Sequence, residues 1–199
     1  DDGFHPIYSS KAKAYRYRLW FGAERNPMIA PFVWQMYNDV DVRKIFAEAA
    51  LIVGRHDFTA FCAADSSAKT KERTVLEVEV FENGPLVDVW MVGEGFLKQM
   101  VRILIGTLVE VGSGRSPPGQ ISRAIASKSR DDSGATAPAQ GLSLVEIFYD
   151  QVPKIADLRR RIAGINRKYA EPVPPPPPRT PQSKRATPRR RSQTRKRHF

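Results

Sequence analysis

The chain has 199 residues, of which 41% are hydrophobic, and a formal net charge of +11. This length suits one ordinary domain with appendages, and no apolar stretch is long enough to cross a bilayer or to form a secretory signal. The single cysteine, Cys62, excludes an internal disulfide framework and fits a reducing compartment. Because no histidine is placed to serve as its base, we interpret Cys62 as a small buried apolar residue and not as a catalytic thiol.

The positive charge is concentrated at the C-terminal end. Residues 179–199 contain nine basic side chains and no acidic one, and residues 154–168 contain six basic side chains and one acidic one. Residues 1–153 carry 17 basic and 19 acidic side chains and are nearly neutral. A nucleic acid bound to this part must therefore be held by a local patch and not by the net charge.

The first predicted element is a strand over residues 11–21, in which side chains alternate between two faces. Arg16 and Arg18 fall on one face, and the other face holds Lys13, Tyr15, Tyr17, Leu19 and Phe21. Tyr15 is then either a core aromatic residue with a satisfied hydroxyl or a ring that lines a base-binding cleft.

Helical spacing of apolar residues follows, with Asp39 as the expected N-cap and Gly54 as the expected end. His56 and Asp57 invite comparison with a catalytic pair, but adjacent residues do not supply a triad geometry. We therefore expect residues 55–61 to form a loop packed by Phe58 and Phe61, and residues 63–71 to form a flexible loop.

Residues 73–82 and 85–92 predict a β-hairpin about Asn83-Gly84, in which Pro85 can widen the loop. After a helix over 95–112, the sequence predicts a shorter helix over 119–127, a mobile loop over 129–138 and a last, central strand over 141–149. This order predicts an α+β fold with a largely antiparallel sheet flanked by helices.

The helix predicted over 95–112 is apolar around most of its circumference and is expected to be nearly all buried, with Gly112 as its left-handed end residue. Arg102 lies at the middle of its narrow polar stripe, with Gly95 and Gly106 on either side giving room for close approach. A buried guanidinium needs a carboxylate or phosphate partner. The alternative is a structural arginine that hydrogen-bonds carbonyl groups or water.

The chain after Pro153 divides into two appendages. We expect residues 1–153 to form the folded domain, residues 154–170 a basic helix, and residues 171–199 a disordered tail rich in proline and arginine. The tail is either simply solvated or a phosphate-binding segment that strengthens RNA contact in a salt-dependent way.

Four blocks of the sequence, in order across residues 4–150, resemble the C-terminal half of the TruA-type tRNA pseudouridine synthases. The blocks are Phe4-His5-Pro6 with the strand through Arg18, Gly54 to Phe61, Gly95 to Gly112, and Ala135 to Leu144. The resemblance implies a pseudouridine synthase fold and isomerisation of uridine in the tRNA anticodon stem-loop without a cofactor or a metal. It also implies tRNA as partner, a homodimer, no membrane, and a location in the cytoplasm or an organelle matrix.

By the family pattern, Tyr15 is the active-site tyrosine and Arg102 pairs with the catalytic aspartate. Leu142 and Phe96 are the expected apolar walls of the substrate pocket. We expect RNA contacts from a further set of basic residues, Lys13, Arg16, Arg18, Arg73 and Lys98.

The Arg-Thr-Asp-x-Gly-Val-type motif that carries the family's catalytic aspartate is not found in this sequence. We therefore expect the chain to be the C-terminal part of a longer enzyme and to be inactive by itself. The alternative is a non-catalytic RNA-binding or ribonucleoprotein component that keeps the fold. A third reading is a globular scaffold with a basic tail and no role with RNA.

Overall fold

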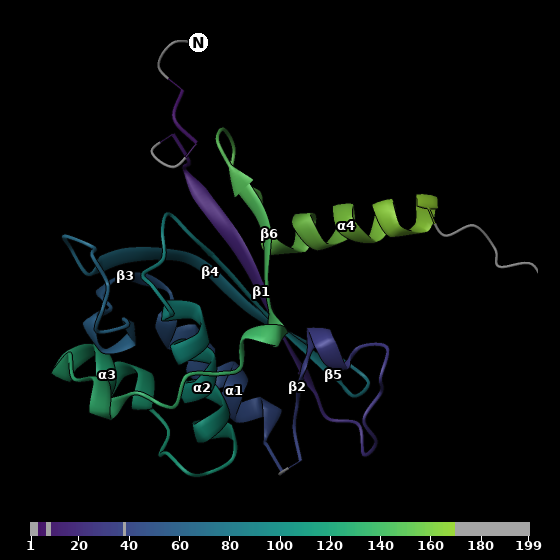
Figure 1. The fold of residues 1–199 in the computed structure, drawn as a ribbon, viewed down its shortest axis with the longest axis horizontal. Coiled ribbons are helices and arrows are strands. Elements are labelled where there is room, and N and C mark those ends of the chain that lie inside the picture. Colours follow the sequence, from purple (N-terminus) through teal and green to yellow (C-terminus); the bar gives the residue numbers. More distant parts are fainter. Residues whose placement is uncertain (1–3, 7–8, 38, 170–199) are drawn as a thin grey trace, which may run out of the picture. The chain divides into compact units, whose positions relative to one another are not determined.

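The computed structural model describes residues 4–6, 9–37 and 39–169, and the predicted tail over 171–199 lies outside these residues. The described part contains a six-stranded sheet and four α-helices (Figure 1). The strands are β1 (Ala12–Trp20), β2 (Trp34–Gln35), β3 (Gly54–Asp57), β4 (Glu72–Asn83), β5 (Leu86–Gly93) and β6 (Leu142–Phe148). The helices are α1 (Val42–Ala49), α2 (Met100–Gly112), α3 (Gln120–Ser127) and α4 (Ile155–Tyr169).

The sheet is mostly antiparallel, which confirms the predicted α+β class. Its order is β2-β1-β5-β4-β3, and β6 also pairs with β1, while the two-residue contact of β2 with β1 is parallel. The prediction of a central last strand was wrong, because within the described residues β6 pairs with β1 alone. Strand β1 is the central one, since β5 pairs along one of its edges and β6 and β2 share the other.

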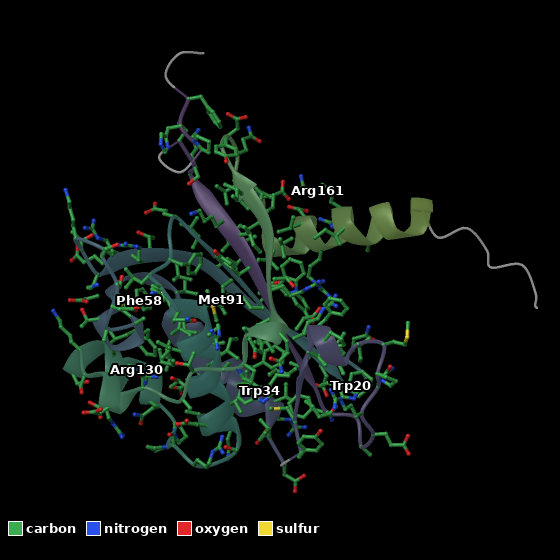
Figure 2. All side chains as sticks on the ribbon, in the orientation of Figure 1. Trp20, Trp34, Phe58, Met91, Arg130 and Arg161 are labelled. Carbon is green, nitrogen blue, oxygen red and sulfur yellow. The ribbon has the colours of Figure 1, made fainter. Side chains whose placement is uncertain are left out.

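Both faces of the sheet are covered, and the alternation along β1 separates them as predicted. Tyr17 and Leu19 belong to the larger core, which α2 fills with Met100, Leu104 and Leu108. In Figure 1, α1, α2 and α3 gather on this face of the sheet, and two members of the same core, Phe58 and Met91, are labelled in Figure 2. A smaller core on the opposite face joins Ala12, Ala14 and Trp90 to Ile155 and Leu158 of α4.

The predicted basic helix exists as α4, but its first residues belong to the folded body. Ile155 and Leu158 are fully buried, and the backbone N–H of Ile155 donates to a carboxylate oxygen of Glu77 (2.8 Å). Among the described residues, the start of α4 up to Ile162 belongs to the same compact unit as the sheet. None of the helices in the described part of the chain is long and apolar enough to cross a membrane.

The helix expected between Asp39 and Gly54 is shorter than predicted. Its cap is Asp41, whose side chain accepts from the backbone N–H of Arg43 (2.9 Å), and α1 ends at Ala49 before a 3-10 turn over Ala50–Ile52. Gly54, with a φ of 120°, then begins β3 and does not end a helix. Apolar spacing continues past the helix because the turn after it is also buried, as Ile52 shows.

The segment expected to be a loop over 55–61 contains β3 and a 3-10 turn at Thr59–Phe61. Phe58 and Phe61 are fully buried, which confirms their packing role. The hairpin of β4 and β5 is confirmed, although its two-residue tip is Gly84-Pro85, because Asn83 pairs with Leu86.

Candidate active site

Helix α2 begins at Met100, five residues later than predicted. The preceding residue, Gln99, has a φ of 65°, which breaks the helical path, and its carbonyl oxygen accepts the first helical hydrogen bond from Ile103 (3.0 Å). Residues 95–99 form an irregular turn that nonetheless directs Leu97 into the core. The apolar spacing extended into the turn because it records burial and not helix geometry. The turn also brings Phe96 into contact with Tyr15 on the central strand β1.

Four residues expected at the site line one cavity of about 110 Å³. They are Tyr15 on β1, Phe96 in the turn, Arg102 on α2 and Leu142 at the start of β6, and the remaining wall includes Gln99 and Met100. Tyr15 and Phe96 meet edge to face, with ring centroids 5.1 Å apart. The cavity therefore combines aromatic and apolar walls with one guanidinium.

The two tyrosines of β1 have different environments. Tyr17 is fully buried, and its hydroxyl donates to the carbonyl of Pro138 (2.6 Å). Tyr15 is half-buried, and its hydroxyl has no hydrogen-bond partner within the described residues. Burial raises the pKa of Tyr15, so its phenol is protonated at neutral pH and can donate a hydrogen bond into the cavity.

Arg102 has more internal partners than the sequence suggested. Its Nε donates to the carbonyl of Ala137 (2.6 Å), and its Nη1 donates to Oε1 of Gln99 (2.7 Å). Among the described residues, Nη2 donates to nothing, and no carboxylate lines the cavity. The side chain thus holds a structural contact while it keeps one edge of the guanidinium open to the cavity.

Gly106 allows a close approach of the backbone, as its position beside Arg102 suggested. A Cβ at this position would lie 1.7 Å from the carbonyl oxygen of Ala135, so Gly106 admits the chain segment over residues 134–137, whose Ala137 carbonyl accepts from Arg102. Gly134 donates to the hydroxyl of Thr107 (2.8 Å), and Ala135 donates to Glu110 (2.8 Å). The loop expected to be mobile is therefore fixed against α2.

Gly112 does not adopt the left-handed conformation that was expected at the end of α2. The positive φ, 74°, occurs at Gly114, two residues further on. A Cβ at Gly112 would lie 2.7 Å from the side chain of Val40, so close packing explains this glycine.

The basic residues expected to contact RNA lie in two places. Lys98 and Arg73 flank the turn beside the cavity. Lys98 forms an ion pair with Asp65 (2.5 Å), and Arg73 lies next to Gly95. Lys13 lies on the same face of β1 as Tyr15, as their alternation requires.

Arg16 and Arg18 lie on the other face of the sheet, where α4 begins. The Arg16 guanidinium lies over the ring of Trp90 (5.4 Å to the centroid), and Arg18 is 3.6 Å from Asp88. Burial lowers the pKa of Arg16 and raises that of Asp88. The structure therefore does not bring these two arginines to the cavity of Tyr15 and Arg102.

Several other candidate residues have structural environments. His56 contacts the carbonyl of Val53 through Nε2 (3.0 Å), and Asp57 accepts from Thr59 and Lys128, so they do not act on each other. Cys62 is buried, as predicted. Within the described residues, no group of three or more His, Cys, Asp or Glu side chains could hold a metal ion.

Gln99 is a polar residue of the cavity that the sequence did not reveal. It contacts Arg102 from three residues earlier, a spacing that brings side chains together on a helix and that could have drawn attention to it. Its exact contact depends on the left-handed backbone that precedes α2, which no residue pattern indicated.

The arrangement defines a class of site. Its rings and apolar walls suit a flat, unstacked base, and its guanidinium suits an anion or a polar edge of that base. The α+β sheet thus has a cavity between β1, β6 and the start of α2 whose walls can accept an unstacked base.

Residues 49–150, just over half of the chain, match the family described as tRNA pseudouridine synthase, and the chain belongs to this family. It is 41% identical over 150 residues to tRNA pseudouridine synthase A of Bacillus licheniformis, a match that covers 75% of this chain and 61% of the relative. The corresponding protein of Syntrophotalea carbinolica is 43% identical over 148 residues, covering 74% of this chain and 59% of the relative. The chain spans about 60% of the length of these curated relatives.

Proposed function

We propose that this chain is the C-terminal catalytic part of a tRNA pseudouridine synthase that isomerises uridine in the anticodon stem-loop. The observation that carries the proposal is the cavity itself. Three segments far apart in sequence, β1, residues 96–102 and the start of β6, supply its aromatic, cationic and apolar walls. The family membership and the relatives named tRNA pseudouridine synthase A support the same reaction.

In this reaction the bond between N1 of uracil and C1′ of ribose breaks, the uracil turns, and C5 bonds to C1′ as it loses its proton, while N1 takes up a proton. The reaction is an isomerisation and consumes no co-reactant. Tyr15 and Phe96 would hold the turning base between a ring edge and a ring face, and Leu142 would close the pocket. The protonated Tyr15 hydroxyl, which has no partner among the described residues, is free to hydrogen-bond the base.

Arg102 would pair with the catalytic carboxylate through its open Nη2 edge. A guanidinium beside a carboxylate lowers the pKa of that carboxylate and keeps it ionised. Because no carboxylate lines the cavity among the described residues, we assign this group to a segment that the present residues do not include. The contacts of Arg102 with Ala137 and Gln99 would hold the guanidinium in place before the carboxylate arrives.

The test is tritium release from tRNA that contains 5-tritiated uridine. We expect none from the 199-residue chain alone, and release after addition, fused or in trans, of the part of the Bacillus licheniformis relative that this chain does not match. In the complemented enzyme, Arg102→Met is expected to abolish release, and Arg102→Lys to restore only part, because a point charge lacks the planar fork of arginine.

Other outcomes would change the assignment. Robust release by the isolated chain would contradict an external carboxylate. Binding of tRNA without release, even when the missing part is supplied and folded, would favour the non-catalytic RNA-binding component.

A further inference from the structure

A second and larger cavity of about 440 Å³ lies next to the first. Gln99 lines both cavities, so the two are neighbours at the start of α2. Side chains capable of donating hydrogen bonds line the second cavity: Thr59, Lys71, Gln99, Lys128, Arg130 and Thr136. Figure 2 labels Arg130 at its place beside α3.

Three cationic side chains line the cavity: Lys71, Lys128 and Arg130. In the described part of the chain, only one of the three contacts a carboxylate. Lys71 Nζ contacts only neutral atoms among the described residues, Sγ of Cys62 (3.5 Å) and the carbonyl of Ser66 (3.4 Å). Arg130 donates to the oxygens of Ser133, Gly134 and Thr136, which are also neutral. Lys128 alone has a carboxylate partner, Asp57 (2.8 Å).

The backbone at the rim of this cavity is also unusual. Gln99 (φ 65°) and Lys128 (φ 57°) are the two residues other than glycine with positive φ in the described part of the chain, and both line the cavity. This conformation is strained for a residue with a side chain, and glycine avoids that strain. Gln99 directly precedes α2 and Lys128 directly follows α3, where glycine would serve, so we attribute the choice of residue to the side chains themselves.

Gln99 links the two cavities chemically. Its Oε1 accepts from Arg102, which leaves its amide Nε2 as a donor without a partner among the described residues. An oxyanion in the second cavity would meet this amide, the ammonium of Lys71 and the hydroxyl group of Thr136, whereas the Thr59 hydroxyl already donates to Asp57 (2.6 Å). Such a mixture of cationic and neutral donors is typical of sites for phosphate oxygens.

We propose that this cavity binds a phosphate of the RNA strand adjacent to the nucleotide whose base enters the cavity of Tyr15 and Arg102. The inference rests on the proposed function, because it takes the same RNA as the substrate. Lys71 supplies a positive charge that no carboxylate among the described residues neutralises. Gln99 lines both cavities and accepts from Arg102, so it connects the phosphate site to the cavity that takes the base.

The test measures binding of a synthetic anticodon stem-loop to the full chain at several salt concentrations. Lys71→Met keeps the aliphatic stem, leaves no carboxylate unpaired and loses only two long contacts with neutral atoms, so the variant should fold, which its thermal unfolding checks. We expect it to weaken binding about tenfold, the effect of one charge-assisted hydrogen bond. It should also reduce the slope of log K against log salt by about 0.7 to 0.9, the share of one phosphate. Lys69→Met, which removes an exposed lysine outside the cavity, is the matched control and should change neither quantity.

A second arm identifies the ligand atom. Stem-loops with one neutral methylphosphonate linkage are compared, with the linkage moved through each position around the target uridine. One position should weaken binding to the unaltered chain about tenfold and have no effect on Lys71→Met, because both changes remove the same contact.

The results separate this inference from the proposed function. Equal effects of every methylphosphonate on both proteins, or unchanged binding by a folded Lys71→Met variant, would overturn the phosphate site. Calorimetric binding of inorganic phosphate that RNA does not displace would overturn the RNA phosphate as its occupant. Absence of tritium release from the complemented enzyme, with the coupling at one linkage intact, would instead refute the proposed reaction and leave the phosphate site standing.

Discussion

Neighbouring residues of one strand have separate tasks in this protein. Tyr15 and Tyr17 share a face of β1, but the Tyr17 hydroxyl is bonded to Pro138 inside the core, and the Tyr15 hydroxyl is open to a cavity. Arg102 hydrogen-bonds a carbonyl, lines the same cavity and has an Nη2 group that donates to no described residue. A hydroxyl without a partner among the described residues therefore distinguishes Tyr15, at the candidate site, from Tyr17 in the core.

This difference predicts opposite effects of the same substitution. Tyr17→Phe leaves a buried carbonyl without its partner and should lower the free energy of unfolding by about 1–3 kcal/mol. Tyr15→Phe removes a hydroxyl that bonds no described residue and should change that free energy by less than about 0.5 kcal/mol. In the complemented enzyme, Tyr15→Phe should reduce tritium release by about 100-fold or more, and Tyr17→Phe should retain more activity at temperatures where it is folded.

Urea denaturation of the isolated chain and the tritium assay check the two halves of this prediction separately. Equal losses of stability from the two substitutions, with activity retained by Tyr15→Phe, would place Tyr15 in the core and not in the site.

Secondary structure elements of this fold are fixed to one another by polar contacts at their ends. Glu48 of α1 is 2% exposed, and its carboxylate accepts from the backbone N–H groups of Gly119 (2.8 Å) and Ile121 (2.6 Å). It therefore caps the N-terminus of α3 from another helix, since Gly119 has no side chain to do so. The other end of α3 presents Lys128 to the second cavity.

Replacement of Glu48 by glutamine tests this cap. Glu48→Gln keeps the shape but loses the charge and one acceptor, so we expect a loss of about 1–3 kcal/mol in the free energy of unfolding. Glu82→Gln, an exposed glutamate near the tip of the hairpin, is the matched control and should change it by less than about 0.5 kcal/mol. The measurement is urea denaturation, and equal midpoints for the two variants would contradict the cap.

Charge is distributed unevenly over the whole molecule. Residues 1–153 are nearly neutral, whereas the last 21 residues carry nine basic side chains and no acidic one. The folded body therefore holds its candidate RNA contacts as local groups of cations, such as those of the second cavity. A contribution of the basic tail to RNA affinity would be independent of the RNA sequence and strongly salt-dependent.

Deletion of residues 179–199 separates the two contributions. We expect weaker tRNA binding and a flatter salt dependence, because fewer counterions are released per complex. In the complemented enzyme, the position of the modified uridine should not change. Binding titrations at several salt concentrations measure the effect, and a slope unaltered by the deletion would exclude the tail as an RNA contact.

The sequence by itself determined the class of fold, the two faces of β1 and four of the residues that line the first cavity. The alternation along β1 and the apolar face around Arg102 are local patterns, and burial imposes such patterns on whatever element is present. The resemblance to the family added Tyr15, Phe96 and Leu142, which the structure places together.

Only the tertiary structure decided where α2 begins, which strand is central and what Arg102 contacts. The apolar residues Phe96 and Leu97 look the same in a buried turn as in a helix, so their spacing could not reveal the break at Gln99. The partners of Arg102 and Glu48 lie 35 and more than 70 residues further along the chain. Hydrogen-bond partners that distant are chosen when the chain packs, because packing alone decides which carbonyl or N–H group comes within reach.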